Sequence, residues 1–309
     1  MFTEGTAVEA RGRITPGCLG IWKDEQVGPL ARVASIIKSY DAVPGIQLAH
    51  AGRKSSMNVP WERGRGLIAD EAGGGWQTVA PSPIPFGPAY PEPHALDADE
   101  IPGILESFAS GARRAREAGF QVIELHAAHG YLLHSFLSPI ANHRDDAFGG
   151  SFEHRARLTL ETVAAIRREW PAELPLFVRI SATDWVEDRP AWTLADSIRL
   201  ARLLGPLGVD VIDCSTGSIV PDIPIPEAPG YQVPFADAIR REAEIATAGV
   251  GLITQPEQAE AIIGDGQADL VVLARAMLDD PQWALHAARR LGAPIAWPAQ
   301  YLRARHTGR

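Results

Sequence analysis

The chain has 309 residues, of which 46% are hydrophobic and 22% are charged, and its formal net charge is −9. This length and composition suffice for one large domain with a buried core, whereas the dispersed lysines and arginines exclude the concentrated basic surface that nucleic acid binding requires. Two cysteines, Cys18 and Cys214, cannot cross-link such a domain, and no run approaches about 20 apolar residues, so we expect a cytoplasmic protein without a signal peptide or membrane span.

Strands and helices alternate along the first half of the chain, interrupted by one irregular segment rich in glycine, proline and tryptophan. In order, the patterns predict the end of a strand at 2–9, a helix at 24–40 capped by Asp24, a strand at 45–50, the irregular segment at 52–98, a helix from Asp97 or Asp99 to Ala118, and a strand from Phe120. So long a loop inside a compact domain is usually functional, and we expect a folded, lid-like insertion over about residues 54–98.

The second half of the chain repeats the alternation more regularly. The patterns predict a helical turn at 132–136, a helix at 151–170 capped by Ser151, a strand at 176–181, a helix at 193–204, a strand at 209–215, an irregular segment at 217–232, a helix at 235–242, a strand at 246–250, a helix at 256–263, a strand at 270–275 and a helix at 281–291. Strands separated by helices pair in parallel, and such a sheet is buried on both faces.

Two architectures fit this alternation, an open doubly wound sheet and a closed (β/α)8 barrel. No Gly-x-Gly-x-x-Gly stands between a strand and a helix, so a Rossmann start is unsupported. A barrel carries its phosphate site after the last two strands, and this chain has Gly249-Val250-Gly251 and Ala274-Arg275 there. The favoured fold is therefore a (β/α)8 TIM barrel that forms one domain over residues 1–309.

The segment 122–131, Val-Ile-Glu-Leu-His-Ala-Ala-His-Gly-Tyr, is the centre of the predicted site. Strand side chains alternate between faces, which puts Glu124 and His126 on the same face. Polar residues recur near the ends of the neighbouring strands, and burial without a partner costs such a group roughly 2–7 kcal/mol. We therefore expect the following residues to be paired or functional: Gln47, Glu124, His126, Arg179 and Asp213.

Three interpretations of His126 and His129 are open. A zinc site with His50 or His143 as further ligands is disfavoured, because the spacing of three and the intervening alanines do not match His-Glu-x-x-His. The second interpretation is a pair of core histidines satisfied by the backbone. In the third, their imidazole N–H groups converge on a substrate oxygen that gains negative charge, and Tyr131 acts as a general acid. None of these side chains can hold a hydride. Under the third interpretation, the protein therefore binds a redox cofactor, or the reaction is not a redox reaction.

A longer series of motifs follows the chain in order: Gly12-Arg13-Ile14, Gly45-Ile46-Gln47-Leu48-Ala49-His50-Ala51-Gly52-Arg53-Lys54, His126-Ala127-Ala128-His129-Gly130-Tyr131-Leu132, Asn142-x-Arg144-x-Asp146-x-Phe148-Gly149-Gly150-Ser151, Phe177-Val178-Arg179-Ile180-Ser181, and the Gly251 and Arg275 segments. This series resembles the old yellow enzyme family of FMN-dependent ene-reductases, and within it the bacterial NADPH dehydrogenase branch. The resemblance extends from Met1 to about Arg303.

The resemblance implies an FMN site built from several strand ends. Gln47 would bind the pyrimidine edge, and Arg179 would stabilise negative charge on the reduced flavin and so raise its reduction potential. Gly5 falls where relatives have a small residue, usually alanine, that contacts the flavin. The phosphate would lie against Gly251, Ala274 and Arg275.

The resemblance also implies the reaction and its partners. His126 and His129 would bind the carbonyl or nitro group of an activated alkene, flavin would deliver hydride to the β carbon, and Tyr131 would protonate the α carbon. NADPH would reduce the flavin at the same face. Arg303 matches a C-terminal arginine that reaches the neighbouring subunit's active site, which implies a homodimer or homotetramer. No resident metal is expected.

Two features depart from the family pattern. Ala274 stands where the family usually has glycine, and its methyl group is expected to crowd the phosphate loop. The chain also begins where the second strand of relatives is ending, so we expect an incomplete barrel without the first strand and helix, with weakened folding or FMN retention. The alternatives are a flavin-poor barrel remnant with a contact role and, less favoured, a phosphosugar enzyme on a related barrel.

Overall fold

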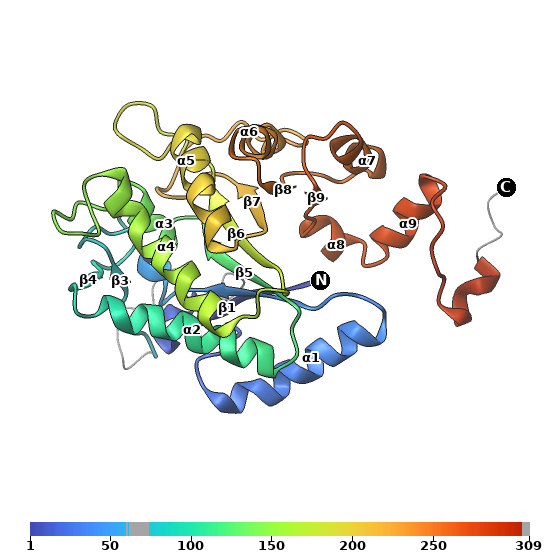
Figure 1. Cartoon of the computed structure of the whole chain (residues 1–309), viewed down its shortest axis with the longest axis horizontal. Coiled ribbons are helices and arrows are strands. Elements are labelled where there is room, and N and C mark those ends of the chain that lie inside the picture. Colours follow the sequence, from blue (N-terminus) through green and yellow to red (C-terminus); the bar gives the residue numbers. More distant parts are fainter. Residues whose placement is uncertain (60, 62–73, 305–309) are drawn as a thin grey trace.

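The structure is a computed structural model that describes residues 1–59, 61 and 74–304. Its centre is a seven-stranded sheet in the order β1-β2-β5-β6-β7-β8-β9, and each neighbouring pair is parallel (Figure 1). The strands are β1 (Phe2–Ala7), β2 (Gly45–Ala49), β5 (Val122–Ala127), β6 (Leu176–Ser181), β7 (Val211–Ser215), β8 (Ala246–Gly249) and β9 (Leu270–Val271).

Helices form a layer outside this sheet (Figure 1). Neighbouring helices in that layer contact one another in the pairs α1 and α2, α2 and α4, α4 and α5, and α5 and α6. The helices are α1 (Val27–Ser39), α2 (Ile101–Glu117), α3 (Leu132–Leu137), α4 (Phe152–Glu169), α5 (Leu194–Leu204), α6 (Val233–Ala243), α7 (Pro256–Gly264), α8 (Arg275–Asp279) and α9 (Trp283–Arg290). Short 3-10 helices add to them at Ala10–Gly12, Asp24–Gln26, Gly52–Lys54, Gly205–Leu207 and Ala299–Ala304.

The sheet curls around a shared interior. Phe2 of β1 and Phe177 of β6 are separated by two strands in the sheet order, yet their ring centroids lie 5.7 Å apart. Strands β1 and β9 are the two edges of the described sheet. The expected barrel architecture with seven strands is therefore confirmed, because only a strongly curled sheet brings such distant strands into contact across its inner face.

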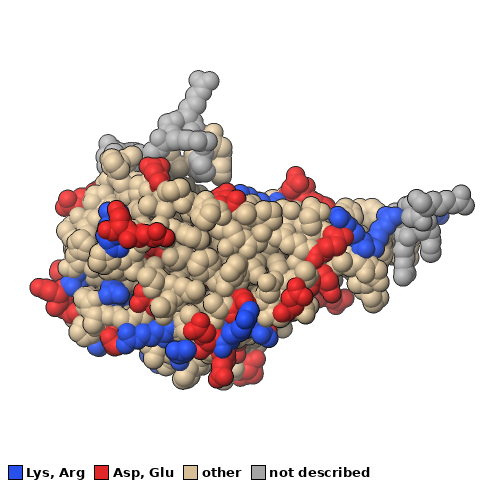
Figure 2. Space-filling model, turned by 90° about the horizontal axis from the view of Figure 1, so that it is seen from above, with Lys and Arg blue, Asp and Glu red and all other residues tan. Residues whose placement is uncertain are grey.

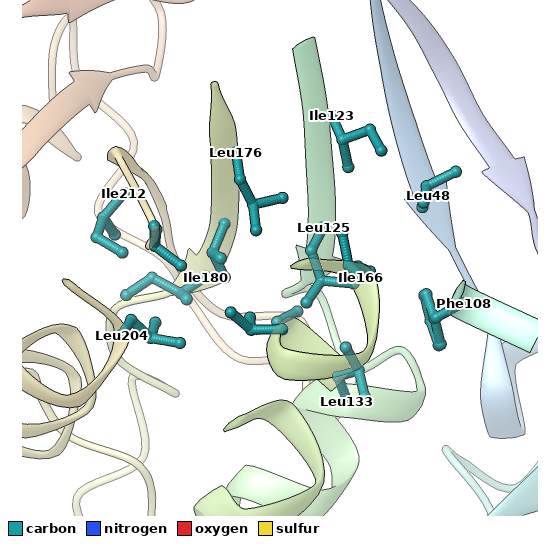
Figure 3. Close-up of a cluster of buried hydrophobic side chains, with 14 of the residues drawn as sticks. Leu48, Phe108, Ile123, Leu125, Leu133, Ile166, Leu176, Ile180, Leu204 and Ile212 are labelled. Carbon is teal, nitrogen blue, oxygen red and sulfur yellow. The ribbon is translucent and has the colours of Figure 1, made fainter. Parts of the chain in front are cut away.

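The alternation of side chains along the strands divides the barrel into an apolar outer layer and a polar interior. The outward residues pack against the helices in one continuous core, of which Figure 3 labels Leu48, Phe108, Ile123, Leu125, Leu133, Ile166, Leu176, Ile180, Leu204 and Ile212. Glu124 and His126 alternate with Ile123 and Leu125 and are also buried. The predicted face of Glu124 and His126 is thus the inner face of the barrel.

The helix boundaries show which local signals were decisive. Ser151 caps α4 as predicted, since its Oγ accepts a hydrogen bond from the backbone N–H of His154. The predicted cap at Asp24 is wrong: its carboxylate accepts from Arg114 Nε at 2.7 Å and from Arg113 at 3.1 Å, both on α2, and the α-helix begins at Val27 after a 3-10 turn. A tertiary ion pair has displaced a local capping interaction.

The irregular segment after β2 contains structure that the sequence did not indicate. Two short parallel strands, β3 (Val79–Ala80) and β4 (His94–Ala95), form a sheet of their own, and α2 begins at Ile101, later than the predicted Asp97 or Asp99. Trp76 donates its indole N–H to Arg11 O at 2.8 Å, which attaches the segment to the loop after β1. Residues 60 and 62–73 of the expected lid lie outside the described residues, so the lid stays a prediction.

The surface carries mixed charge. Figure 2 shows acidic and basic side chains interspersed over the visible face, and the segment that carries α9 projects from the body. Within residues 1–59 and 74–304, no helix combines the length and the apolar character needed to cross a membrane.

Candidate active site at the carboxyl ends of the strands

Two adjoining cavities lie at the carboxyl ends of the strands and contain most of the predicted site residues. The smaller, about 150 Å³, is lined among others by Gly5, Gln47, His126, His129 and Tyr131. The larger, about 310 Å³, is lined among others by His129, Arg179, Gly251, Ala274 and Arg275. His129 lines both cavities, so together they form one site. A third cavity, between the loops after β6 and β7, contains none of these residues.

A tight corner after β5 positions the histidines and the tyrosine. His129 and Gly130 both have positive φ, +59° and +71°, and a Cβ at Gly130 would lie 2.2 Å from Ser218 O. Only glycine fits there, because any side chain would clash with backbone that cannot move away. The backbone N–H of His129 is held by Ser181 Oγ at 2.9 Å, and α3 begins directly after Tyr131.

His126 is a neutral hydrogen-bond donor that faces the smaller cavity. Its Nδ1 accepts the backbone N–H of Ala128 at 3.3 Å, which leaves the proton on Nε2. Burial, and then the positive charge of Arg179, lower its pKa well below the ordinary value. The ring lies 5.0 Å from that of Tyr131, edge to face. His126 therefore presents one N–H without carrying a charge.

His129 differs from His126 because the protein already engages its Nε2. That atom lies 2.6 Å from Ser215 Oγ, and Ser215 Oγ donates to Gln232 Oε1 at 3.1 Å, so His129 is the donor to Ser215. Burial, and then His126, lower the pKa of His129 well below its ordinary value. The two histidine N–H groups thus do not converge on one point here, and no sequence pattern indicated a role for Ser215 or Gln232.

Tyr131 lines the smaller cavity, and Lys54 lies next to the Tyr131 ring. Burial raises the pKa of Tyr131 to about 12, so its hydroxyl keeps its proton. Lys54 Nζ lies 5.3 Å from the Tyr131 ring centroid and donates to His129 O at 2.8 Å. Burial, and then the charge of Arg53, lower the pKa of Lys54 to about 8. No role was predicted for Lys54, although its place in the short connection after β2 was a usable signal.

The end of the site near β1, β2 and β6 suits a flavin ring. Gln47 donates its amide N–H to Glu124 Oε1 at 2.6 Å, and a Cβ at Gly5 would lie 3.2 Å from Gln47 Oε1, so small residues are favoured at position 5. Arg179 Nε is buried without a hydrogen-bond partner among the described residues. A guanidinium whose Nε has no partner beside a cavity fits an electron-rich ring edge that gains charge on reduction.

The other end of the larger cavity suits a phosphate. Gly251 has φ +112°, and a Cβ there would lie 2.8 Å from Gln232 Nε2. Arg275 lines the cavity and makes no ion pair within the described part of the chain. Ala274 lines the same cavity with φ −119°, outside the left-handed region, so its backbone does not require glycine; crowding of the phosphate loop by its methyl group stays a prediction. The residues present therefore fit FMN.

Replacing Gly251 by alanine is expected to weaken FMN binding about tenfold or more. The added Cβ would lie 2.8 Å from Gln232 Nε2 and 3.0 Å from Tyr231 Cε1, so these two residues of the cavity lining must shift, and a loss of about 1.4 kcal/mol in binding free energy corresponds to tenfold in affinity. Fluorescence titration of the apoprotein with FMN measures this. Gly266→Ala is the control, because Gly266 has φ +69° but no atom within 4 Å of its added Cβ. Equal FMN affinity of the two variants would contradict the prediction.

Arg303, which was expected in the neighbouring subunit's site, and His50, a ligand in the disfavoured zinc interpretation, do not join the site within this chain. Arg303 lines neither cavity and lies after α9 in the segment that projects from the barrel (Figure 1). His50 is not a third zinc ligand, because its Nδ1 accepts the backbone N–H of Gly52 at 3.1 Å and its Nε2 lies 3.3 Å from Glu9 Oε2. Both ring nitrogens of His50 are thus used by the protein itself.

Comparisons with known proteins agree with this site. Residues 1–293 match the NADH:flavin oxidoreductase / NADH oxidase family. The NADPH dehydrogenase of Geobacillus sp. (strain WCH70) is 46% identical over 303 residues, and that of Bacillus subtilis (strain 168) is 41% identical over 304; each alignment covers 98% of this chain and 83% of the relative.

Solved structures show the same fold. Morphinone reductase in complex with tetrahydroNAD superposes with a TM-score of 0.76 at 27% identity, covering 96% of this chain and 79% of that one. 2-Naphthoyl-CoA reductase gives 0.81 at 24% identity, covering 95% and 44%, and supports the fold alone. The expected oxidoreductase with FMN as its cofactor is confirmed, and the chain belongs to the NADH:flavin oxidoreductase / NADH oxidase family.

Proposed function

We propose that this flavoenzyme reduces activated alkenes, such as enones or nitroalkenes, with NADPH as the electron donor. FMN, when bound, supplies the hydride transfer from NADPH to the β carbon that no side chain can perform. The observation that supports the proposal is the placement of His126, His129 and Tyr131 around one cavity, with ring centroids 5.0–6.5 Å apart. This reaction needs two groups from the protein, a hydrogen-bond donor that binds the substrate oxygen and a protonated phenol that donates the proton.

The side chains have separate tasks. The His126 Nε2–H would bind and polarise the carbonyl or nitro oxygen, and a neutral imidazole does so without placing a full charge in the buried cavity. Tyr131 would hold its proton until the α carbon gains electron density and then transfer it. His129 would join His126 after exchanging Ser215 for the substrate oxygen. One hydride and one proton are thus added across the double bond.

Isotope placement tests this proposal directly. The protein is loaded with FMN, reduced anaerobically with NADPH carrying deuterium on its transferable position, and mixed with 2-cyclohexenone. Deuterium at the β carbon, and solvent deuterium at the α carbon when the reaction runs in D2O, is the expected result. Flavin that NADPH bleaches but cyclohexenone, a nitroalkene and a maleimide all fail to reoxidise would overturn the alkene proposal. Failure to take up FMN would favour the barrel remnant.

We further propose a homodimer or homotetramer in which Arg303 completes the neighbouring subunit's site. Its support is the position of Arg303 outside its own cavities, on a segment whose Tyr301 and Leu302 are 49% and 46% exposed. Arg303→Ala and His126→Ala subunits, each poorly active alone, are expected to regain activity when mixed, because a hybrid unites an intact site with an intact arginine. Arg289→Ala replaces Arg303→Ala in the control mixture. Light scattering that shows only monomers would contradict the assembly.

A further inference from the structure

Two buried carboxyl groups in the barrel interior have no task in the proposed reaction. Glu124 is 3% exposed and Asp213 is 0% exposed. Register places Glu124 beside Gln47 on β2, and Asp213 beside Arg179 on β6. Burying two negative charges next to one positive charge is costly, because the low-dielectric interior penalises each uncompensated ion by several kcal/mol. Some arrangement must remove one of these charges.

The contacts of the two carboxyl groups are unequal. Glu124 Oε1 accepts a hydrogen bond from Gln47 Nε2 at 2.6 Å. Asp213 Oδ2 lies 3.3 Å from Arg179 Nη1, yet neither Asp213 oxygen receives a hydrogen bond from an N–H or hydroxyl group of the described residues. The Glu124 carboxyl group lies within hydrogen-bond reach of Asp213. A protonated Glu124 is therefore the donor that Asp213 lacks.

Charge favours the same assignment. Burial, and then the negative charge of Asp213, raise the pKa of Glu124 to about 8, and burial raises that of Asp213. Arg179 directly contacts Asp213, which favours the ionised form there. Two other titratable groups lie near the pair. His126 is neutral, because burial lowers its pKa, and the Cys214 thiol stays protonated, because burial raises its pKa. Strands β2 and β8 contain no titratable residue.

We propose that Glu124 and Asp213 share one proton and act together as positioning residues. The pair then carries a single negative charge beside Arg179, and this charge sets the net charge around the guanidinium that faces the flavin. Arg179 lines the larger cavity while its Nη1 faces Asp213. The pair thus balances the cation that the reduced flavin meets. This inference depends on FMN binding and on the proposed place of Arg179 beside the flavin, but not on which alkene is reduced.

A double-mutant cycle distinguishes a shared proton from two independent charges. If the proton is shared, Glu124→Gln leaves Asp213 ionised and Asp213→Asn leaves Glu124 ionised, so each single variant keeps one negative charge. Only the double variant removes it. We therefore expect the flavin reduction potential to change little in the single variants and to rise strongly in the double variant. The expected rise corresponds to reduced FMN binding about tenfold more tightly relative to oxidised FMN than in the wild type.

Each possible result of the double-mutant cycle supports or contradicts the shared proton. Single variants that each raise the potential, with additive effects in the double variant, would mean two ionised carboxylates and overturn the proposal. No change in any variant would mean that the pair does not act on the flavin and would also overturn it. Glu106→Gln, an exposed carboxyl group on α2, is the control and is expected to leave the potential unchanged. The potential is read without any alkene, so failure of the alkene proposal leaves this result interpretable.

A second measurement uses the apoprotein and needs no flavin. A carboxyl group whose pKa is raised on folding binds its proton more tightly in the native state, so its contribution to stability is greatest below pH 4.5 and is lost as pH rises to about 8. Glu124→Gln cannot lose this proton. Its urea unfolding free energy is therefore expected to fall less than that of the wild type between these pH values, and parallel profiles would contradict a proton on Glu124.

Discussion

Replacing Tyr131 by phenylalanine is expected to slow enone reduction by roughly 10²–10⁴-fold, the usual contribution of a positioned general acid, while NADPH reduces the bound FMN as fast as in the wild type. The substitution removes only the hydroxyl group and keeps the ring that packs 5.0 Å from His126. The effect should therefore appear in one half-reaction. Anaerobic stopped-flow spectroscopy follows flavin bleaching by NADPH and flavin reoxidation by 2-cyclohexenone separately.

The control for this variant is Tyr40→Phe, because Tyr40 is 80% exposed after α1 and lines neither cavity of the site. With a pKa of about 12, Tyr131 stays protonated throughout the neutral range, so the wild-type reoxidation rate should not fall between pH 6 and 9 through ionisation of this phenol. Equal slowing of both half-reactions in Tyr131→Phe would point to lost substrate binding and against a proton donor.

The polar interior of the barrel was predictable because it follows from strand geometry alone. Side chains alternate with a period of two, so the positions of Glu124 and His126 relative to Ile123 were fixed once the segment was assigned as a strand. The glycine corner after His129 was likewise a local signal. The expected alignment of strand ends then brought Gln47 and Arg179 to the same end of the barrel, as the structure shows.

The missed features depend on pairs of residues far apart in the chain. Ser215 engages His129 across 86 positions, and nothing in either local sequence marks the other. Asp24 has every property of a helix cap but binds Arg114 instead, since the packing of α2 delivers a guanidinium to it. Strands β3 and β4 have two residues each, too few for any periodicity to appear. Local chemistry restricts such residues to several roles, and tertiary packing selects among them.

Replacing His126 by alanine is expected to lower kcat/KM for 2-cyclohexenone by about 10²–10³-fold, the effect of removing one donor from an oxygen that gains charge. Among the described residues no hydrogen bond engages His126 Nε2, whereas His129 Nε2 is engaged with Ser215. Steady-state kinetics measure the loss. His126→Asn retains an N–H donor and should recover part of the activity, which a merely structural histidine would not predict.

His143→Ala is the matched control, because His143 is exposed and its ring has no role in the site. The same variant tests the disfavoured zinc interpretation, in which His143 would be a ligand and its loss would cost activity. The pH profile provides the stricter test. Since burial lowers the pKa of His126 well below 6.5, the imidazole stays neutral and the rate should not follow a histidine titration. A rate that rises below pH 6.5 in the wild type but not in His126→Asn would show that the cationic form binds the substrate oxygen, and would overturn the neutral donor.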